Sequence, residues 1–162
     1  MMEVSRRLIR AIDTQIEVLV EASVDDVWRA LTDDIGGWWP REFYADSTAR
    51  AFVVEARVGG RVYEDWGDGD GALWGMVVAC RRPRILQWAG DLAADFGGPT
   101  RSVTSFRLEE HEGGTRVTLR DTPFGAVADD CEEEIEGSWR YLLADCLKPF
   151  VEGDRPDEEP AN

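Results

Sequence analysis

The sequence is poor in the residues that most hydrolytic and metal sites require. It has one histidine, His111, and three cysteines, none of which belongs to a Cys-x-x-Cys pair. Zinc-hydrolase motifs, Ser-His-Asp triads and Cys-His dyads that use a buried histidine are therefore disfavoured. We expect His111 to lie exposed in a hairpin turn, the cysteines to be reduced and mostly buried, and the protein to need no metal or other cofactor.

Basic residues and long apolar runs are also scarce. Lys and Arg total 18 against 33 Asp and Glu, which gives a formal net charge of -15 at pH 7. Nucleic-acid binding depends on neutralising phosphates, so this charge balance argues against a nucleic-acid partner. No stretch approaches the ~20 apolar residues of a membrane span, and charges interrupt the apolar residues at the N-terminus. We therefore expect a cytoplasmic monomer or homodimer without membrane insertion.

The first third of the chain predicts a strand, a helix and a turn. In residues 15–21 Ile16, Val18 and Val20 alternate with other residues, which is the period of a strand with one buried face. Ser23 is a good helix N-cap, and apolar residues at helical spacing predict a helix over 24–32. Pro40 then forces Trp39 out of the α region, so the Trp38-Trp39-Pro40 segment is expected to turn.

The middle of the chain predicts six further strands. Short alternating segments are separated by turn residues, and they cover 51–58, 60–66, 73–80, 85–89, 102–109 and 117–120. The connections are too short for crossover helices, so neighbouring strands must be mostly antiparallel. The pattern indicates a meander.

The C-terminal part predicts one long amphipathic helix. Apolar residues recur at i, i+3, i+4, i+7, i+8 and i+11 from Trp139 to Phe150, and the preceding segment 129–136 is acidic, as suits a helix N-terminus. Gly137 inside this helix either costs about 1 kcal/mol and allows a bend, or permits a close approach by the sheet or a ligand. We expect a single domain over 1–152 and a disordered acidic tail over 153–162.

Several short motifs occur in one order along most of the chain, from Ile16 to Glu152. They are residues 22–33 (ASVDDVWRALTD), 38–40 (WWP), 58–61 (VGGR), 74–77 (WGMV), 83–88 (PRILQW), 114–119 (GTRVTL) and 137–143 (GSWRYLL). This series resembles the START-like or SRPBCC superfamily, and within it the branch named for homologues of the activator of heat-shock-protein ATPase. The resemblance implies an α+β helix-grip fold, in which a curved antiparallel sheet of six to seven strands wraps a long C-terminal helix.

Members of that superfamily enclose an apolar cavity between sheet and helix and bind lipids, hormones or polyketides. The seven tryptophans of this chain either fill the core or line such a cavity. If the cavity is open, we expect ten residues to bind the ligand: Trp39, Val62, Glu64, Trp66, Trp74, Met76, Trp88, Phe106, Trp139 and Leu143.

Two acidic residues are candidates for chemistry. Glu64 is in phase with Val62 and Trp66, so it points inward if they do, and a carboxyl in an apolar pocket could serve as a general acid or base. An ion pair with a neighbouring arginine, or reversed parity that exposes Glu64, are the favoured alternatives. Asp121 follows the last strand in phase with Leu119, so it either reaches a cavity mouth or forms a turn.

Three functions are compatible with these observations. The first is binding of a small hydrophobic molecule, and we expect binding rather than catalysis. The second is an enzyme of the polyketide cyclase or aromatase kind, with Glu64, Tyr63 or Asp121 moving protons. The third is a stress-related interaction module that meets another protein through an exposed patch around Trp38 and Trp39.

Overall fold

The computed structural model describes residues 2–4, 8–93, 98–127 and 130–153 of the chain. Its strands are β1 (Arg10–Ala11), β2 (Thr14–Val20), β3 (Ala51–Val54), β4 (Arg61–Gly67), β5 (Asp70–Arg81), β6 (Ile85–Leu92), β7 (Thr100–His111), β8 (Gly114–Asp121) and β9 (Phe124–Gly125). Its helices are α1 (Val24–Leu31), the short 3₁₀ turns η1 (Ile35–Gly37) and η2 (Arg41–Phe43), and the C-terminal α2 (Cys131–Arg140), η4 (Tyr141–Leu147) and α3 (Lys148–Glu152).

The sheet is an antiparallel meander, as the short turns predicted. Strands β3 to β8 pair in sequence order, and β2 returns to pair with β8. All seven predicted strands are present, and the two-residue strands β1 and β9 bring the sheet to nine. Asp68 and Gly69 connect β4 to β5 with positive φ angles of 57° and 88°, which is the conformation of a tight hairpin turn.

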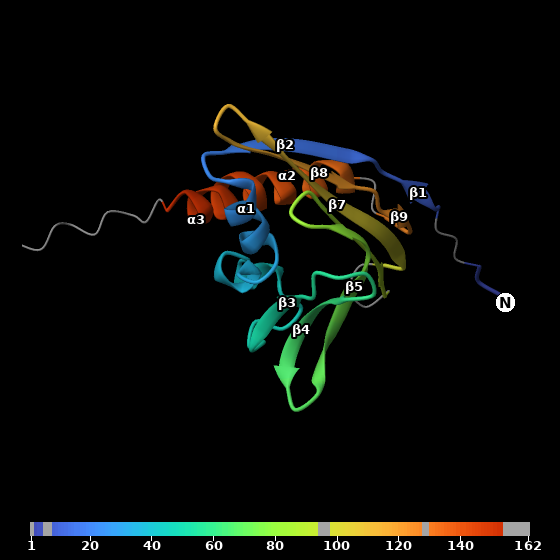
Figure 1. The fold of residues 1–162 in the computed structure, drawn as a ribbon. Coiled ribbons are helices and arrows are strands. Elements are labelled where there is room, and N and C mark those ends of the chain that lie inside the picture. The colour runs from blue at the N-terminus through green and yellow to red at the C-terminus, as the bar shows by residue number, and fades with distance from the viewer. Residues whose placement is uncertain (1, 5–7, 94–97, 128–129, 154–162) are drawn as a thin grey trace, which may run out of the picture.

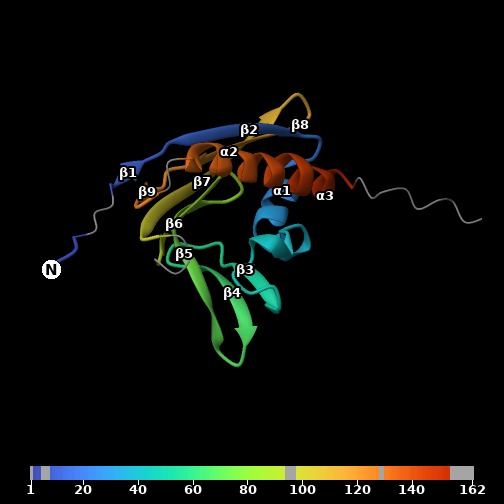
Figure 2. The same cartoon turned by 180° about the vertical axis from the view of Figure 1, so that it is seen from behind.

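The long helix lies against the inner face of the sheet and confirms the α+β helix-grip prediction. Figures 1 and 2 show α2 and α3 running beneath β2 and β8, while β3, β4 and β5 bend away toward the far end of the molecule. Leu142, Leu143 and Leu147 are buried on this helix and pack into the core. Ile16, Val18 and Val20 of β2 face the same interior.

The C-terminal helix departs from the predicted regular α-helix. Residues Tyr141–Leu147 form a π-helical stretch between α2 and α3, and the helix ends at Gly153, whose φ is 74°. A Cβ at Gly137 would meet nothing within 4 Å, so the predicted close approach of the sheet at this glycine is wrong. The predicted disordered tail lies, apart from Gly153, outside the described residues.

The Trp38-Trp39 segment is packed against α1. Ser23 caps this helix by accepting a 3.1 Å hydrogen bond from the Asp26 backbone N–H. Trp38 is only 7% exposed, and its indole N–H donates to the Ala30 carbonyl at 2.7 Å. Trp38 is therefore part of the core, and the predicted exposed patch around Trp38 and Trp39 is wrong.

Candidate functional site

A cavity of about 580 Å³ lies between the inner face of the sheet and α2. The sheet supplies one wall, and Ile135 and Trp139 of α2 supply the facing wall. The lining residues that are exposed to solvent are Asp91, at the end of β6, and Glu134 on α2. The cavity therefore opens between the end of β6 and the first turns of α2.

Aromatic rings form a continuous part of the cavity wall. The ring of Trp39 stacks on Phe52 at 4.9 Å and 5°, and it meets Trp139 edge-on at 6.1 Å. Phe43 lies 6.4 Å from Trp39 on the other side. Trp139 also contacts Phe106, which is buried in the layer behind the wall. These rings give the cavity a broad apolar surface.

A β-bulge places Trp74 in the wall. Val62 pairs with Gly75 and Tyr63 pairs with Leu73, so Trp74 is an extra residue on β5. The strands approach closely here, since a Cβ on Gly90 would lie 1.7 Å from the Trp74 carbonyl oxygen.

The bulge also corrects the expectation for Met76. Strict alternation would put Met76 on the same face as Trp74, but the extra residue shifts the phase of the strand. The Met76 side chain is 45% exposed and lies outside the cavity.

A polar strip runs along β7 and ends at a buried carboxylate. Thr100, Ser102 and Thr104 occupy alternate positions and line the cavity. Asp121, opposite Thr104 on β8, is 9% exposed. Its Oδ1 accepts hydrogen bonds from Ser102 Oγ at 2.5 Å and Thr104 Oγ1 at 3.2 Å, and its Oδ2 accepts from Trp139 Nε1 at 2.9 Å. Asp121 thus belongs to the cavity wall, and the predicted turn-forming role is wrong.

Glu64 points inward but stands behind the wall. Its side chain is fully buried, and Oε2 accepts hydrogen bonds from Trp74 Nε1 at 2.6 Å and the Ala45 N–H at 2.7 Å. Oε1 accepts from Trp66 Nε1 and the Asp46 N–H, both at 3.2 Å. Glu64 is thus not exposed, and it forms no ion pair with an arginine in the described part of the chain. Each oxygen of Glu64 therefore accepts two hydrogen bonds, which hold Trp74 and the segment after η2 in place. Glu64 itself is not among the residues that line the cavity.

The predicted ligand-binding residues fall into two further groups. Five of them line the cavity: Trp39, Val62, Trp74, Trp88 and Trp139. Trp66, Phe106 and Leu143 pack in the core layer behind it. Tyr63 faces outward, with the Arg61 guanidinium 4.4 Å above its ring. The sequence analysis missed Ser102 and Thr104, although their alternation in phase with the inward-facing Phe106 is a readable signal.

Thiols and metal ligands add no reactive centre to this site. Burial raises the pKa of the Cys131 thiol at the cavity wall, while nearby Arg10 acts in the opposite direction. A protonated thiol is a poor nucleophile at neutral pH. All three cysteines are free. Within the described residues, no three His, Cys, Asp or Glu side chains are grouped so as to hold a metal ion.

Comparisons with known proteins agree with this architecture. The sequence model of the family described as Activator of Hsp90 ATPase homolog 1-like protein matches residues 21–152. The fold is similar to an uncharacterized protein from Rhizobium leguminosarum, with 21% identity, a TM-score of 0.67, and coverage of 92% of this chain and 99% of that one. No curated protein matches the sequence.

Two further solved structures are similar. CalU16 from Micromonospora echinospora is 23% identical with a TM-score of 0.62, and the match covers 96% of this chain and 89% of that one. The Aha1 dimer from Colwellia psychrerythraea is 20% identical with a TM-score of 0.57, over 87% of this chain and 96% of that one. These likenesses confirm the fold of the predicted superfamily. None of the helices in the described ranges is long and apolar enough to span a membrane.

Proposed function

We propose a binding function for this chain, which belongs to the family of Activator of Hsp90 ATPase homolog 1-like proteins: it holds a small, largely apolar molecule between the sheet and α2. The observation that carries this proposal is the cavity of about 580 Å³. That volume lies within the range of about 300–1,000 Å³ of small-molecule sites. A mostly apolar wall that includes six aromatic side chains, with one hydrogen-bonding strip, is also the usual chemistry of such sites.

The packing around the cavity supports a preformed site. Trp39 contacts Phe52 face to face and Trp139 edge-on, and Trp139 is held by its hydrogen bond to Asp121. Trp74 is held by Glu64 in the same way. Side chains fixed by such contacts lose little further freedom when a ligand enters, which lowers the entropic cost of binding.

A cavity-filling substitution tests the proposal. The probe is 9-anthracenemethanol, whose absorption overlaps tryptophan emission, so that binding quenches the emission by energy transfer. Ile135→Trp places a larger side chain in the cavity and should weaken probe binding at least about tenfold, which corresponds to about 1.4 kcal/mol. Glu133→Trp, at an exposed position on the same helix, is the matched control and should bind as the unaltered protein does.

Two results would contradict a binding function. One is the absence of any tryptophan response to apolar ring compounds together with no co-purified molecule in native mass spectrometry. The other is equal weakening by Ile135→Trp and Glu133→Trp, which would place the probe outside the cavity.

An enzyme of the polyketide cyclase or aromatase kind is the second candidate, and Asp121 is the observation that favours it. Of the three acid–base candidates, Asp121 lines the cavity, whereas Glu64 lies behind the wall and Tyr63 faces outward. Turnover of a cavity-bound substrate that Asp121→Asn abolishes while retaining binding would support this alternative. Full activity in that variant would remove Asp121 from the mechanism.

A further inference from the structure

The charged groups of the cavity all have one sign. Three carboxylates, Asp91, Asp121 and Glu134, are among the lining residues, whereas no lysine or arginine is found among the described residues that line it. Asp121 is buried, and its three hydrogen-bond partners among the described residues are the neutral groups of Ser102, Thr104 and Trp139. Neutral dipoles stabilise a carboxylate without cancelling its charge, so the field inside the cavity stays negative.

Among the described residues, one arginine forms an ion pair with a lining carboxylate, and it does so at the rim of the cavity. Arg101 lies 3.9 Å from Asp91, but the two side chains are 55% and 75% exposed, so solvent and salt screen the pair. Arg10 on β1 lies near Cys131, yet it is not a lining residue. The inner end of the cavity, at Asp121, receives no ion pair among the described residues.

The aromatic side chains of the cavity wall also favour a cation. The face of an indole ring carries negative electrostatic potential and attracts cations. Trp39, Trp74, Trp88 and Trp139 all line the cavity. From the described residues, Oδ2 of Asp121 accepts one hydrogen bond, that of Trp139, and a carboxylate oxygen can accept two. This oxygen can therefore accept a second hydrogen bond from a ligand.

We propose that the cavity selects an apolar, ring-containing molecule that carries a protonated amine, and that it discriminates against the same molecule with a carboxylate. The amine donates to Asp121, and the rings lie against the tryptophans. Asp91 and Glu134 at the opening attract the cation as it enters. This inference rests on the proposed binding function and adds the chemical class of the ligand.

Three anthracene derivatives test the charge preference. They carry a methylamine, a hydroxymethyl or a carboxylate group on the same ring, so that only the polar group differs. Affinity, measured by quenching of tryptophan emission at pH 7 and low salt, should fall in that order. We expect the ammonium form to bind at least about tenfold more tightly than the carboxylate, which is about 1.4 kcal/mol. The ratio should shrink as salt is added.

Charge-neutral variants locate the effect. The pair Asp91→Asn and Glu134→Gln removes two exposed lining charges with little risk to folding, and it should reduce the amine-to-carboxylate ratio about threefold. The pair Glu132→Gln and Glu133→Gln removes two charges from exposed positions of α2 outside the cavity, and it should leave the ratio unchanged. Asp121→Asn should reduce the ratio further than the rim pair does.

The outcomes separate this inference from the binding function. Binding of all three derivatives with equal affinity, or tightest binding of the carboxylate, would overturn the charge preference and leave the cavity as a binding site. A further contrary result is that the variant with Asp91→Asn and Glu134→Gln and the variant with Glu132→Gln and Glu133→Gln lose the preference for the amine equally. That result would also overturn the charge preference, because the net charge of the protein would then be its cause. Failure of all three to bind would count against both proposals.

Discussion

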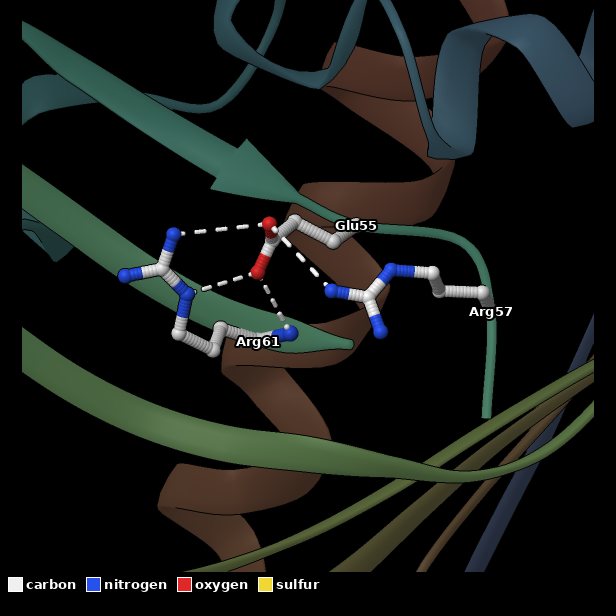
Figure 3. Close-up of polar contacts among 3 residues, drawn as sticks. All are labelled: Glu55, Arg57 and Arg61. Carbon is white, nitrogen blue, oxygen red and sulfur yellow. Dashed lines mark hydrogen bonds and ion pairs between the residues drawn. The ribbon is translucent and has the colours of Figure 1, made fainter. Parts of the chain in front are cut away.

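Glu55, which precedes β4, and Glu64, which is part of β4, differ in how their charges are stabilised. Glu55, in the β3–β4 loop, is bound by arginines: Arg61 Nε lies 2.7 Å from Oε1, and Arg57 Nη2 lies 3.9 Å from Oε2 (Figure 3). Arg61 holds the pKa of Glu55 below its ordinary value. Glu64, inside the sheet on β4, is bound by two indole and two backbone N–H groups. Arginine cations therefore neutralise the surface carboxylate, whereas neutral hydrogen-bond donors stabilise the interior carboxylate without cancelling its charge.

The same contrast separates two neighbours on β8. Arg120 faces outward and binds Asp13 with hydrogen bonds of 2.8 and 2.6 Å, which keeps the pKa of Asp13 below its ordinary value. Asp121 faces inward and accepts from hydroxyl and indole donors. Among the described residues, Glu55 and Asp13 at the surface are paired with arginines, whereas Glu64 and Asp121 in the interior are stabilised by neutral hydrogen-bond donors. Removing an inner carboxylate should therefore cost much more stability than removing an outer one.

The largest effect is expected from Glu64→Leu. This change leaves the indole N–H groups of Trp66 and Trp74 and two backbone N–H groups without an acceptor. Each buried donor that loses its partner costs about 1–3 kcal/mol, so the free energy of unfolding should fall by at least about 3 kcal/mol. Urea unfolding followed by tryptophan emission measures this loss.

Glu55→Leu is the matched control for that experiment, because it makes the same substitution at the surface end of the hairpin. It should change the unfolding midpoint far less. Should Glu64→Leu fail to fold, Glu64→Gln keeps the side-chain shape and replaces one acceptor oxygen by a donor, and it should destabilise by about 1–3 kcal/mol. Equal effects at positions 55 and 64 would show that the inner and outer carboxylates do not differ.

A smaller loss is expected from Asp121→Ala. The Trp139 N–H then lacks its acceptor, whereas the hydroxyls of Ser102 and Thr104 can rotate toward other partners. The free energy of unfolding should fall by about 1–2 kcal/mol, and Trp139 emission should shift to the red as water enters. A loss as large as that of Glu64→Leu would mean that the hydroxyls are also left without partners.

The smallest effect is expected at the outer pair of Asp13 and Arg120. Because Arg120 lowers the folded-state pKa of Asp13 below 3.8, the pair contributes stability at neutral pH that is lost as pH falls through that lowered pKa. The stability difference between the unaltered protein and Arg120→Met should be slight at pH 7, smaller in high salt, and absent once the pH is below that lowered pKa. A difference that grows toward low pH would contradict this assignment.

Short connections predicted the antiparallel meander, and periodicity predicted the buried face of β2. Ile16, Val18 and Val20 alternate as a half-buried strand should, and the turns between later strands allow only antiparallel neighbours. The alternation also predicted that Val62 and Glu64 share one face of the strand, and the structure buries both of them. Strands of two residues, such as β1 and β9, carry no period and were not predicted.

Features set by tertiary contacts could not be predicted in the same way. The bulge at Trp74 depends on the pairing of β5 with β4, so the outward position of Met76 is invisible in the sequence of β5 alone. The four donors around Glu64 come from three separate segments of the chain, and only folding brings them together. Sequence could suggest that Glu64 is buried, but it could not distinguish a reactive carboxyl from one fully occupied by hydrogen bonds.

The order of the chain has a consequence for how the protein folds. Trp39 and Trp139 meet in the cavity wall although they lie far apart in the sequence. In the same way β2, near the start of the chain, pairs with β8, which comes after most of the sheet. Contacts between residues so far apart in the sequence slow folding, because the entropy of closing the long loop is lost before the contacts form. A molecule that binds the finished cavity would stabilise it by about 2.7 kcal/mol at a free concentration one hundred times its Kd. In that sense the ligand would act as the last-added part of the hydrophobic core.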